Sequence, residues 1–207
     1  YNIAIPSLLG LYFIERGFKG SDAASSIAIL NRLIAKCAKR KISKIVVPFF
    51  EANAIENEDD KNEYVKNLVP CLAFAKQKGI RLIFEAPLPA EELKEFIARF
   101  ENDSLRVIYD TGNMTTVLGE KVPHDIQTLG PLIESVHIKD RKYGSTTSYP
   151  LGEGETPFDN ILKALKTIDY QGFLICETAR KPGTDDKTLM AQYKSFLDKK
   201  IHEIIFN

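Results

Sequence analysis

The chain has 207 residues, of which 44% are hydrophobic and 27% are charged, as is ordinary for a globular protein. Its 28 basic and 28 acidic residues give a formal net charge of zero, so no global charge attracts it to nucleic acid or to an anionic membrane. No apolar run approaches the roughly 20 residues that cross a bilayer, and no signal peptide is visible. The three cysteines lie apart within apolar patterns, which indicates reduced core residues and a cytoplasmic protein.

Strand-like and helix-like patterns alternate along the whole chain. In chain order, strands are predicted at 2–6, 44–50, 81–85, 106–110, 133–137 and 173–177. Helices are predicted at 22–40, 59–77, 89–100, 124–129, 157–168 and 185–199, with an irregular loop before the fourth of them. Repeated βα units of this kind indicate a parallel sheet covered by helices.

Polar side chains end the last four predicted strands. They are Glu85, Asp110, His137 and Glu177. An open doubly wound sheet usually serves its ligand from two neighbouring strands, whereas a closed (β/α)8 barrel makes four consecutive strand ends converge. The pattern therefore favours an α/β fold of the (β/α)8 TIM-barrel type.

Only six strands are predicted, which is two fewer than a barrel needs. The chain also starts at Tyr1 without a methionine, almost directly in a strand. The simplest interpretation is that the first two βα units are missing. Residues 1–207 would then form a single domain that holds barrel strands three to eight.

The four strand-end residues offer up to six carboxylate oxygens and one imidazole nitrogen. This set suits one divalent metal ion, with Mn²⁺ favoured and Mg²⁺, Co²⁺ or Zn²⁺ possible. Cys176 alternates to the face opposite Glu177 and is not a candidate ligand. The alternative is that each residue caps a helix or pairs with a lysine. Three carboxylates in one cluster would repel strongly without a cation or shared protons, which favours the metal.

The segments around these residues carry a family resemblance. They are Ile-Phe-Glu85-Ala-Pro, Tyr-Asp110-Thr-Gly-Asn, Val-His137-Ile-Lys-Asp, residues 151–162 and Tyr170-Gln-Gly-Phe-Leu-Ile-Cys-Glu177. The chain resembles the xylose-isomerase-like TIM barrels, and within them the sugar-phosphate isomerases and epimerases, including the ketopentose 3-epimerases. The resemblance covers nearly the whole chain, from the third barrel strand onward.

The resemblance implies a divalent-metal-dependent isomerase or epimerase of a sugar or sugar phosphate. One metal ion would be held by Glu85, Asp110, His137 and Glu177, and would polarise a ketose carbonyl and an adjacent hydroxyl. Glu85 and Glu177 would lie on opposite sides of the sugar and act as catalytic acid and base. One of them would remove the α-proton to give an enediolate, and the same or the other glutamate would return a proton.

Five further residues are candidates for contacts with the substrate: Lys139, Arg141, Asn113, Arg180 and Glu51. Lys139 points to the same side as His137 and either contacts substrate or pairs with Asp140 or a neighbouring carboxylate. Arg141 and Arg180 begin the loops after the last two strands, where barrel enzymes often bind phosphate; solvated surface charge is the alternative.

Asn113 and Glu51 complete these candidates at the mouth of the barrel. Asn113 stands where several relatives have a histidine, which weakens a site with several metal ions and leaves it as a hydroxyl ligand. Glu51 follows the strand predicted at 44–50 and is expected to line the mouth. The Gly152-x-Gly154 pair does not directly follow a strand, so it predicts a tight turn and not a dinucleotide site.

Three other functions remain open. A single-metal dehydratase or lyase acting on a polyol or inositol-like substrate is the main alternative. An endonuclease of the endonuclease IV type is disfavoured by the three histidines, by Asn113 and by the zero net charge. If Tyr1 is the true beginning, unpaired strand edges would suit an inactive scaffold. No nucleic-acid or membrane partner is expected, whereas a homo-oligomer is possible.

Overall fold

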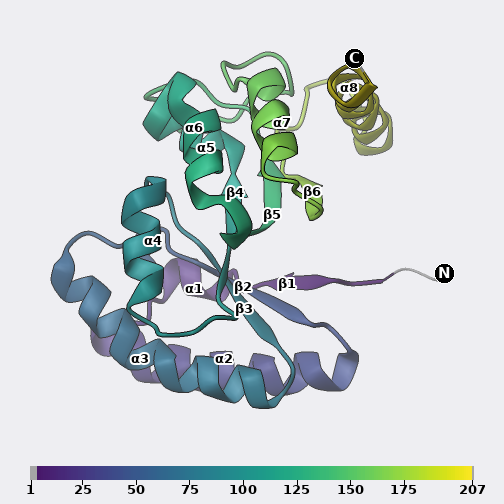
Figure 1. Ribbon diagram of the computed structural model, residues 1–207. Helices are drawn as coiled ribbons and strands as arrows, with labels where there is room; N and C mark the ends of the chain where they lie inside the picture. Colours follow the sequence, from purple (N-terminus) through teal and green to yellow (C-terminus); the bar gives the residue numbers. More distant parts are fainter. Residues whose placement is uncertain (1–3, 207) are drawn as a thin grey trace. The chain divides into compact units, whose positions relative to one another are not determined.

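The computed structural model describes residues 4–206 and divides into two compact units. The first unit comprises residues 4–86 and 92–108, and the second comprises residues 87–91 and 109–206. In both units parallel strands alternate with helices along the chain (Figure 1). The prediction of an α/β fold built from repeated βα units is therefore confirmed.

The first unit is built on parallel strands that pair in chain order. They are β1 (Ser7–Leu9), β2 (Lys44–Pro48), β3 (Arg81–Glu85) and β4 (Arg106–Asp110). The last two residues of β4 belong to the second unit. Val46, Ile83 and Ile108 form a buried cluster from alternate positions of three successive strands, as a pleated sheet requires. This cluster fixes which side chains of β2, β3 and β4 share a face.

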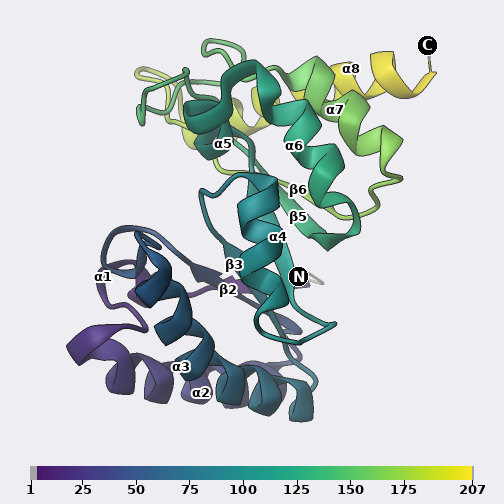
Figure 2. The same cartoon turned by 60° about the vertical axis from the view of Figure 1, so that its left-hand side comes forward.

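Helices of the first unit cover its strands. They are α1 (Tyr12–Glu15), α2 (Ala23–Arg40), α3 (Glu58–Gln77) and α4 (Ala90–Ala98, whose first two residues belong to the second unit), with 3-10 turns η1 (Gly20–Asp22) and η2 (Glu51–Asn53). Helices α2 and α3 lie side by side (Figures 1 and 2). Phe49, Tyr64, Phe84 and Phe96 are fully buried in edge-to-face and stacked ring contacts. These rings anchor α3 and α4 to the strands.

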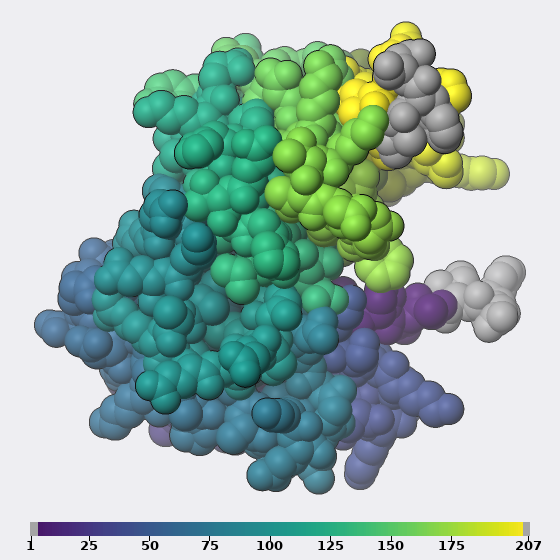
Figure 3. Space-filling view, in the orientation of Figure 1, coloured from purple at the N-terminus to yellow at the C-terminus, as the bar shows by residue number. Residues whose placement is uncertain are grey.

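The second unit pairs two parallel strands and packs helices against them. Its elements are β5 (Ile133–Ile138), β6 (Phe173–Cys176), α5 (Thr111–Leu118), α6 (Val122–Leu129), α7 (Phe158–Thr167), α8 (Asp186–Phe206) and the 3-10 turns η3 (Gly119–Lys121) and η4 (Gly130–Leu132). Helices α6 and α7 pack side by side (Figure 2), and Figure 3 shows side chains of α7 in lime green on the face seen in Figure 1. Although α8 is 21 residues long, no helix within residues 4–206 is both long and apolar enough to span a membrane.

Several predicted boundaries are wrong. In the described part of the chain the first strand is Ser7–Leu9, and residues 4–6 of the strand predicted at 2–6 are not in a strand, whereas its residues 2–3 lie outside the described residues. The irregular loop predicted after Asp110 is instead helix α5, which starts at the next residue. Its Thr-rich sequence lacks a clear apolar stripe, so periodicity does not reveal it. The last helix is longer than predicted, and β6 ends at Cys176, one residue before Glu177.

A charged cluster fastens the segment after α1 to the start of α3. The Lys19 ammonium donates to Asp60 Oδ2 at 2.8 Å and to the Ala54 carbonyl at 2.9 Å. Asp60 Oδ2 also accepts the Glu56 N–H at 2.9 Å. Burial favours the neutral acid, but these hydrogen bonds outweigh it and hold the pKa of Asp60 below its usual 3.8.

The substitution Asp60→Asn should therefore lower the free energy of unfolding by about 1 kcal/mol at neutral pH. Because the folded-state pKa is depressed, this stabilisation is present above pH 3.8 and is lost as the pH falls through the folded-state pKa. Urea unfolding at a series of pH values measures it, with the exposed neighbour Asp59→Asn as control. A stability difference that does not change with pH would contradict the assignment.

Candidate metal centre

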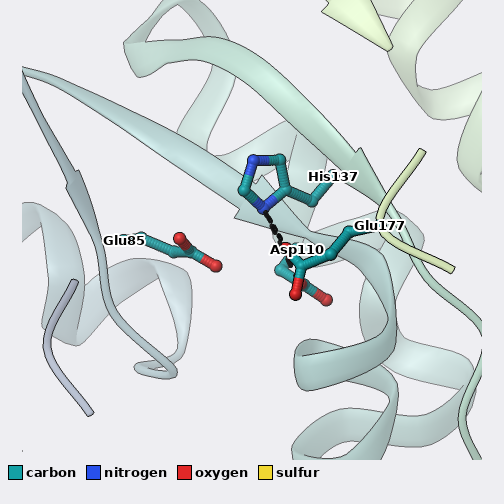
Figure 4. A group of neighbouring side chains, drawn as sticks. All are labelled: Glu85, Asp110, His137 and Glu177. Atoms are coloured by element: carbon teal, nitrogen blue, oxygen red, sulfur yellow. Dashed lines mark ion pairs between the residues drawn. The ribbon is translucent and has the colours of Figure 1, made fainter. Parts of the chain in front are cut away.

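Three of the predicted ligands come together in the second unit. Asp110 ends β4, His137 lies near the end of β5, and Glu177 directly follows β6. His137 Nδ1 lies 2.8 Å from Glu177 Oε2 and 3.9 Å from Asp110 Oδ2 (Figure 4). One ligand atom from each of the three lies within 4.8 Å of those of the other two. The imidazole and both carboxylates thus face a common point.

The strand register explains this convergence. His137 pairs with Ile175, and the Glu177 N–H donates to the Ile138 carbonyl at 3.1 Å, so the ladder continues one residue past β6. Side chains alternate along each strand, which puts Glu177 on the same face as His137. Val136 and Ile138 on the opposite face are fully buried. Val136 and Ile138 therefore lie on one face of the strands, while His137 and Glu177 share the other.

Asp110 is both the last residue of β4 and the N-cap residue of α5. Its Oδ1 accepts the Asn113 N–H at 2.8 Å, as an N-cap residue does. This bond leaves Oδ2 on the side of His137 and Lys139. The Asp110 side chain is only 2% exposed, so its orientation is fixed by the cap. Helix capping thus aims one carboxylate oxygen into the centre.

Lys139 is the cation that joins the carboxylates. Its Nζ lies 2.9 Å from Asp110 Oδ2 and 2.5 Å from Glu177 Oε1, and the residue is 7% exposed. Burial lowers the pKa of Lys139, but the attraction of the two carboxylates dominates and raises it above 10.5. Burial likewise favours neutral Glu177, but hydrogen bonds from His137 and Lys139 lower its pKa from 4.5 to about 2. Glu177 is therefore ionised at neutral pH.

The backbone of Lys139 is held by two threonine side chains. Thr111 Oγ1 accepts the Lys139 N–H at 3.0 Å and donates to the Lys139 carbonyl at 2.8 Å. Thr156 Oγ1 donates to the same carbonyl at 3.3 Å. Gly112 leaves room for the lysine stem, since a Cβ there would lie 2.6 Å from Lys139 Cγ. The Asp110-Thr-Gly segment thus positions both a carboxylate and its cationic partner.

Asp140 organises the loop that follows β5. Its Oδ2 accepts the N–H groups of Gly152 at 2.8 Å and Gly154 at 3.0 Å, and its Oδ1 accepts that of Thr156 at 3.1 Å. The Asp140 residue is 1% exposed. A Cβ on Gly154 would collide with Asp140 Oδ1, so glycine permits the close approach. The Gly-x-Gly pair is therefore a cradle for a carboxylate of the same chain, as well as a turn.

Glu85 and the remaining candidate residues differ in burial and in their hydrogen-bond partners. Glu85 is the last residue of β3, in the first unit, and is 5% exposed. Asn113 is buried at the start of α5. Arg141 Nε donates to Ser148 Oγ at 3.5 Å, within its own loop. Arg180 is 86% exposed and pairs with Asp186 at 3.3 Å. Their roles toward a substrate stay predictions.

Glu51 is an exposed residue with an unusual backbone conformation. Glu51 begins η2 after β2 and has a φ of +49°, in the left-handed region. Residues other than glycine rarely adopt this conformation, and it occurs often at binding sites. Its role in lining the mouth remains a prediction.

Sequence reasoning missed the supports of the centre. The sequence patterns do not single out Thr111 or Gly112, and they indicate Asp140 only as a possible partner of Lys139. Lys139 forms ion pairs with Asp110 and Glu177 and not with Asp140, and its contact with a substrate stays a prediction. Side chains two residues apart on a strand share a face, so the spacing of His137 and Lys139 indicates that the lysine lies near the proposed ligands. The contact of Lys139 with Gly112 depends on tertiary packing, which the sequence pattern does not show.

The substitution Asp140→Ala should lower the free energy of unfolding by about 1 to 3 kcal/mol, because the buried Thr156 N–H and the partly buried N–H groups of Gly152 and Gly154 lose their acceptor. Hydrogen exchange at Gly152, Gly154 and Thr156 should accelerate, as measured by NMR or mass spectrometry. Glu155→Ala is the matched control, since its carboxylate accepts one exposed N–H from Tyr143. Equal effects of the two substitutions would refute a special role for Asp140.

Comparison with known proteins places the chain in a family. A family model described as xylose isomerase-like TIM barrel matches residues 1–200. Inosose dehydratase from Clostridium perfringens is 22% identical over 160 residues, in a match that covers 65% of this chain and 52% of that protein. The chain thus spans about half the length of the first curated relatives it matches.

Solved structures of similar fold agree with this assignment. L-ribulose 3-epimerase is 22% identical, with a TM-score of 0.78 over 96% of this chain and 75% of that one. A xylose isomerase-like TIM barrel protein from Mycobacterium smegmatis in complex with magnesium is 15% identical, with a TM-score of 0.74 over 98% and 74%. At such identities these similarities establish the fold alone. Because the family model matches nearly the whole chain, the protein belongs to the xylose isomerase-like TIM barrel family.

Proposed function

We propose that the protein is a divalent-metal-dependent isomerase or epimerase of a sugar or sugar phosphate. The observation that carries this proposal is the convergence of Asp110, His137 and Glu177 at strand ends of the second unit. The similarity to inosose dehydratase and to L-ribulose 3-epimerase supports a reaction on a polyhydroxylated substrate.

The donor set fits one hard or borderline divalent ion. Carboxylate oxygens and an imidazole nitrogen suit Mn²⁺, Mg²⁺, Co²⁺ or Zn²⁺. Two ligands on opposite sides of one ion lie about 4 to 5 Å apart at ordinary bond lengths. Atoms from Asp110, His137 and Glu177 meet this requirement, since they lie within 4.8 Å of one another. Mn²⁺ is our preferred ion because the oxygen-rich set holds a single imidazole.

Glu85 is our proposed fourth ligand. In the β3–β4 ladder Phe84 pairs with Val107, so Glu85 falls opposite Ile108. Paired residues of parallel strands share a face, so Glu85 lies on the face of Ile108 at the end of β3.

The two glutamates would move the proton. When bound, the metal ion would supply Lewis-acid polarisation of the substrate carbonyl. Glu177 has an ionised carboxylate and a side chain that is 46% exposed, so a substrate can reach it as a proton acceptor. His137 and Lys139 hold both of its oxygens and fix its direction. Glu85 is our proposed partner on the other side of the sugar.

A dehydratase of a polyol or inositol-like compound is the second candidate. It is favoured by the curated relatives named inosose dehydratase. Epimerisation, isomerisation and dehydration can each begin with removal of a proton next to a carbonyl. They differ in the next step, since the proton is returned in the first two and a hydroxide is expelled in the third. The same residues would therefore serve either outcome.

We also infer that the six strands correspond to strands three to eight of the family barrel. The chain aligns over 96% of its own length but only 75% of the L-ribulose 3-epimerase chain. The proposed ligands would then end the last four strands. The substrate would be a small sugar or sugar phosphate.

Metal content gives the first test of the proposal. Protein purified without chelator should contain about one Mn, Co, Mg or Zn ion per chain by elemental analysis. His137→Ala should lose this ion, because the only imidazole of the centre is removed, whereas the exposed His124→Ala should retain it. Two or three zinc ions per chain would instead favour the nuclease. No bound metal after soaking with Mn²⁺ would refute the centre.

Proton transfer gives the second test. A panel of ketoses, their phosphates and inososes is incubated with the Mn²⁺-loaded protein in D₂O and followed by NMR and mass spectrometry. Deuterium next to the carbonyl without loss of water identifies an isomerase or epimerase, whereas loss of water identifies a dehydratase. Glu177→Gln should lower kcat by about 10²- to 10⁴-fold, and Glu153→Gln should leave it unchanged. Near-normal turnover in Glu177→Gln would refute its role as base.

A further inference from the structure

We propose that Lys139 is an internal counterion of the metal centre. Its ammonium holds Asp110 and Glu177 together in metal-free protein and competes with a divalent ion for their oxygens. The competition rests on the proposed metal centre. The stabilisation of metal-free protein by Lys139 does not depend on a sugar substrate. The counterion proposal and the proposed sugar reaction can therefore fail separately.

Charge and burial require such a cation. Asp110 is almost fully buried, and Glu177 has its carboxylate beside it. Two neighbouring carboxylates in a poorly solvated site repel unless a cation lies between them. Lys139 Nζ contacts one oxygen of each, at 2.9 and 2.5 Å. His137 Nδ1 faces the same pair but carries charge only when the imidazole is protonated.

Hydrogen bonds to its backbone and close packing of its side chain position Lys139 at the site. Thr111 bonds both the N–H and the carbonyl of Lys139, and Thr156 bonds the carbonyl again. Gly112 leaves the space through which the aliphatic stem passes. A side chain whose backbone and stem are both held loses little further freedom when its ammonium binds the carboxylates. The ammonium is therefore pre-positioned at the two proposed ligands.

Competition follows from this placement. Asp110 Oδ2 lies on the side of His137, where a metal ion would bind, and it is also the oxygen that contacts Lys139. A divalent ion and an ammonium ion repel each other at such distances. Metal binding must therefore weaken the contacts of Lys139 with Asp110 and Glu177. In return, Lys139 should weaken the affinity for the metal.

The test is Lys139→Met, which keeps most of the side-chain length but removes the charge. In chelator-treated protein the variant should have a lower thermal midpoint than wild type, by several degrees. Its affinity for Mn²⁺ alone, measured by calorimetry or electron paramagnetic resonance, should be at least about 10-fold tighter. The gain in thermal midpoint on adding Mn²⁺ should also be larger in the variant.

Lys142→Met is the matched control on the same loop. Lys142 lies over the Tyr149 ring at 5.1 Å, with no ion pair to Asp110 or Glu177 among the described residues. This control should leave both the Mn²⁺ affinity and the metal-free thermal midpoint close to wild type. Equal effects of Lys142→Met and Lys139→Met would overturn the counterion, because a general loss of positive charge would then explain both.

Gly112→Ala tests the same idea with the charge retained. Gly112 lies in α5 without a positive φ, so alanine suits its backbone and should stabilise a helix by itself. The added Cβ must push the Lys139 stem aside. We expect a lower metal-free thermal midpoint and tighter Mn²⁺ binding, but little further change in affinity when Lys139→Met is already present.

The outcomes separate the two proposals. Mn²⁺ binding by wild type with equal or weaker binding by folded Lys139→Met overturns the counterion and leaves the metal centre standing. No Mn²⁺ binding by any variant overturns the metal centre and the competition with it. Tighter binding together with a lower metal-free midpoint supports the counterion, whichever sugar reaction the protein performs.

Discussion

Repulsion between carboxylates at the ends of parallel strands is the constraint on which the second unit depends. The register of β5 with the β6 segment brings Glu177 to the face of His137. The cap of α5 turns Asp110 toward the same point. Such a cluster is unfavourable without positive charge, and Lys139 supplies it within the fold. The acidity of Glu177 and the basicity of Lys139 both follow from this arrangement.

Backbone hydrogen bonds give the cluster its rigidity. Asp110 accepts an N–H at the start of α5, and Asp140 accepts three N–H groups of the loop after β5. Thr111 joins the two segments by bonding both backbone groups of Lys139. Glycine at 112 and 154 allows the side chains to approach. Each charged group is therefore oriented by the same bonds that end a strand or begin a helix.

Sequence patterns predicted the architecture better than its details. Apolar runs predicted β2 to β5 closely because buried parallel strands have a strong signal. Helix α5 was missed because its start is governed by the cap and threonines of its first turns, not by an apolar stripe. Strand-end position singled out Asp110, His137 and Glu177. The contacts of Gly112 and Asp140 could not be predicted, since they depend on segments distant in the chain.

The carboxylate of Asp140 has a consequence for the loop of residues 141–156. Backbone N–H groups presented by a Gly-x-Gly turn commonly bind an external anion, but here the chain fills that cradle with its own aspartate. Asp140 is also the direct neighbour of Lys139 in sequence. The loop and the carboxylate cluster are therefore linked through a single peptide unit. We therefore expect substitutions in the loop to change the position of the Lys139 ammonium without contacting any proposed ligand.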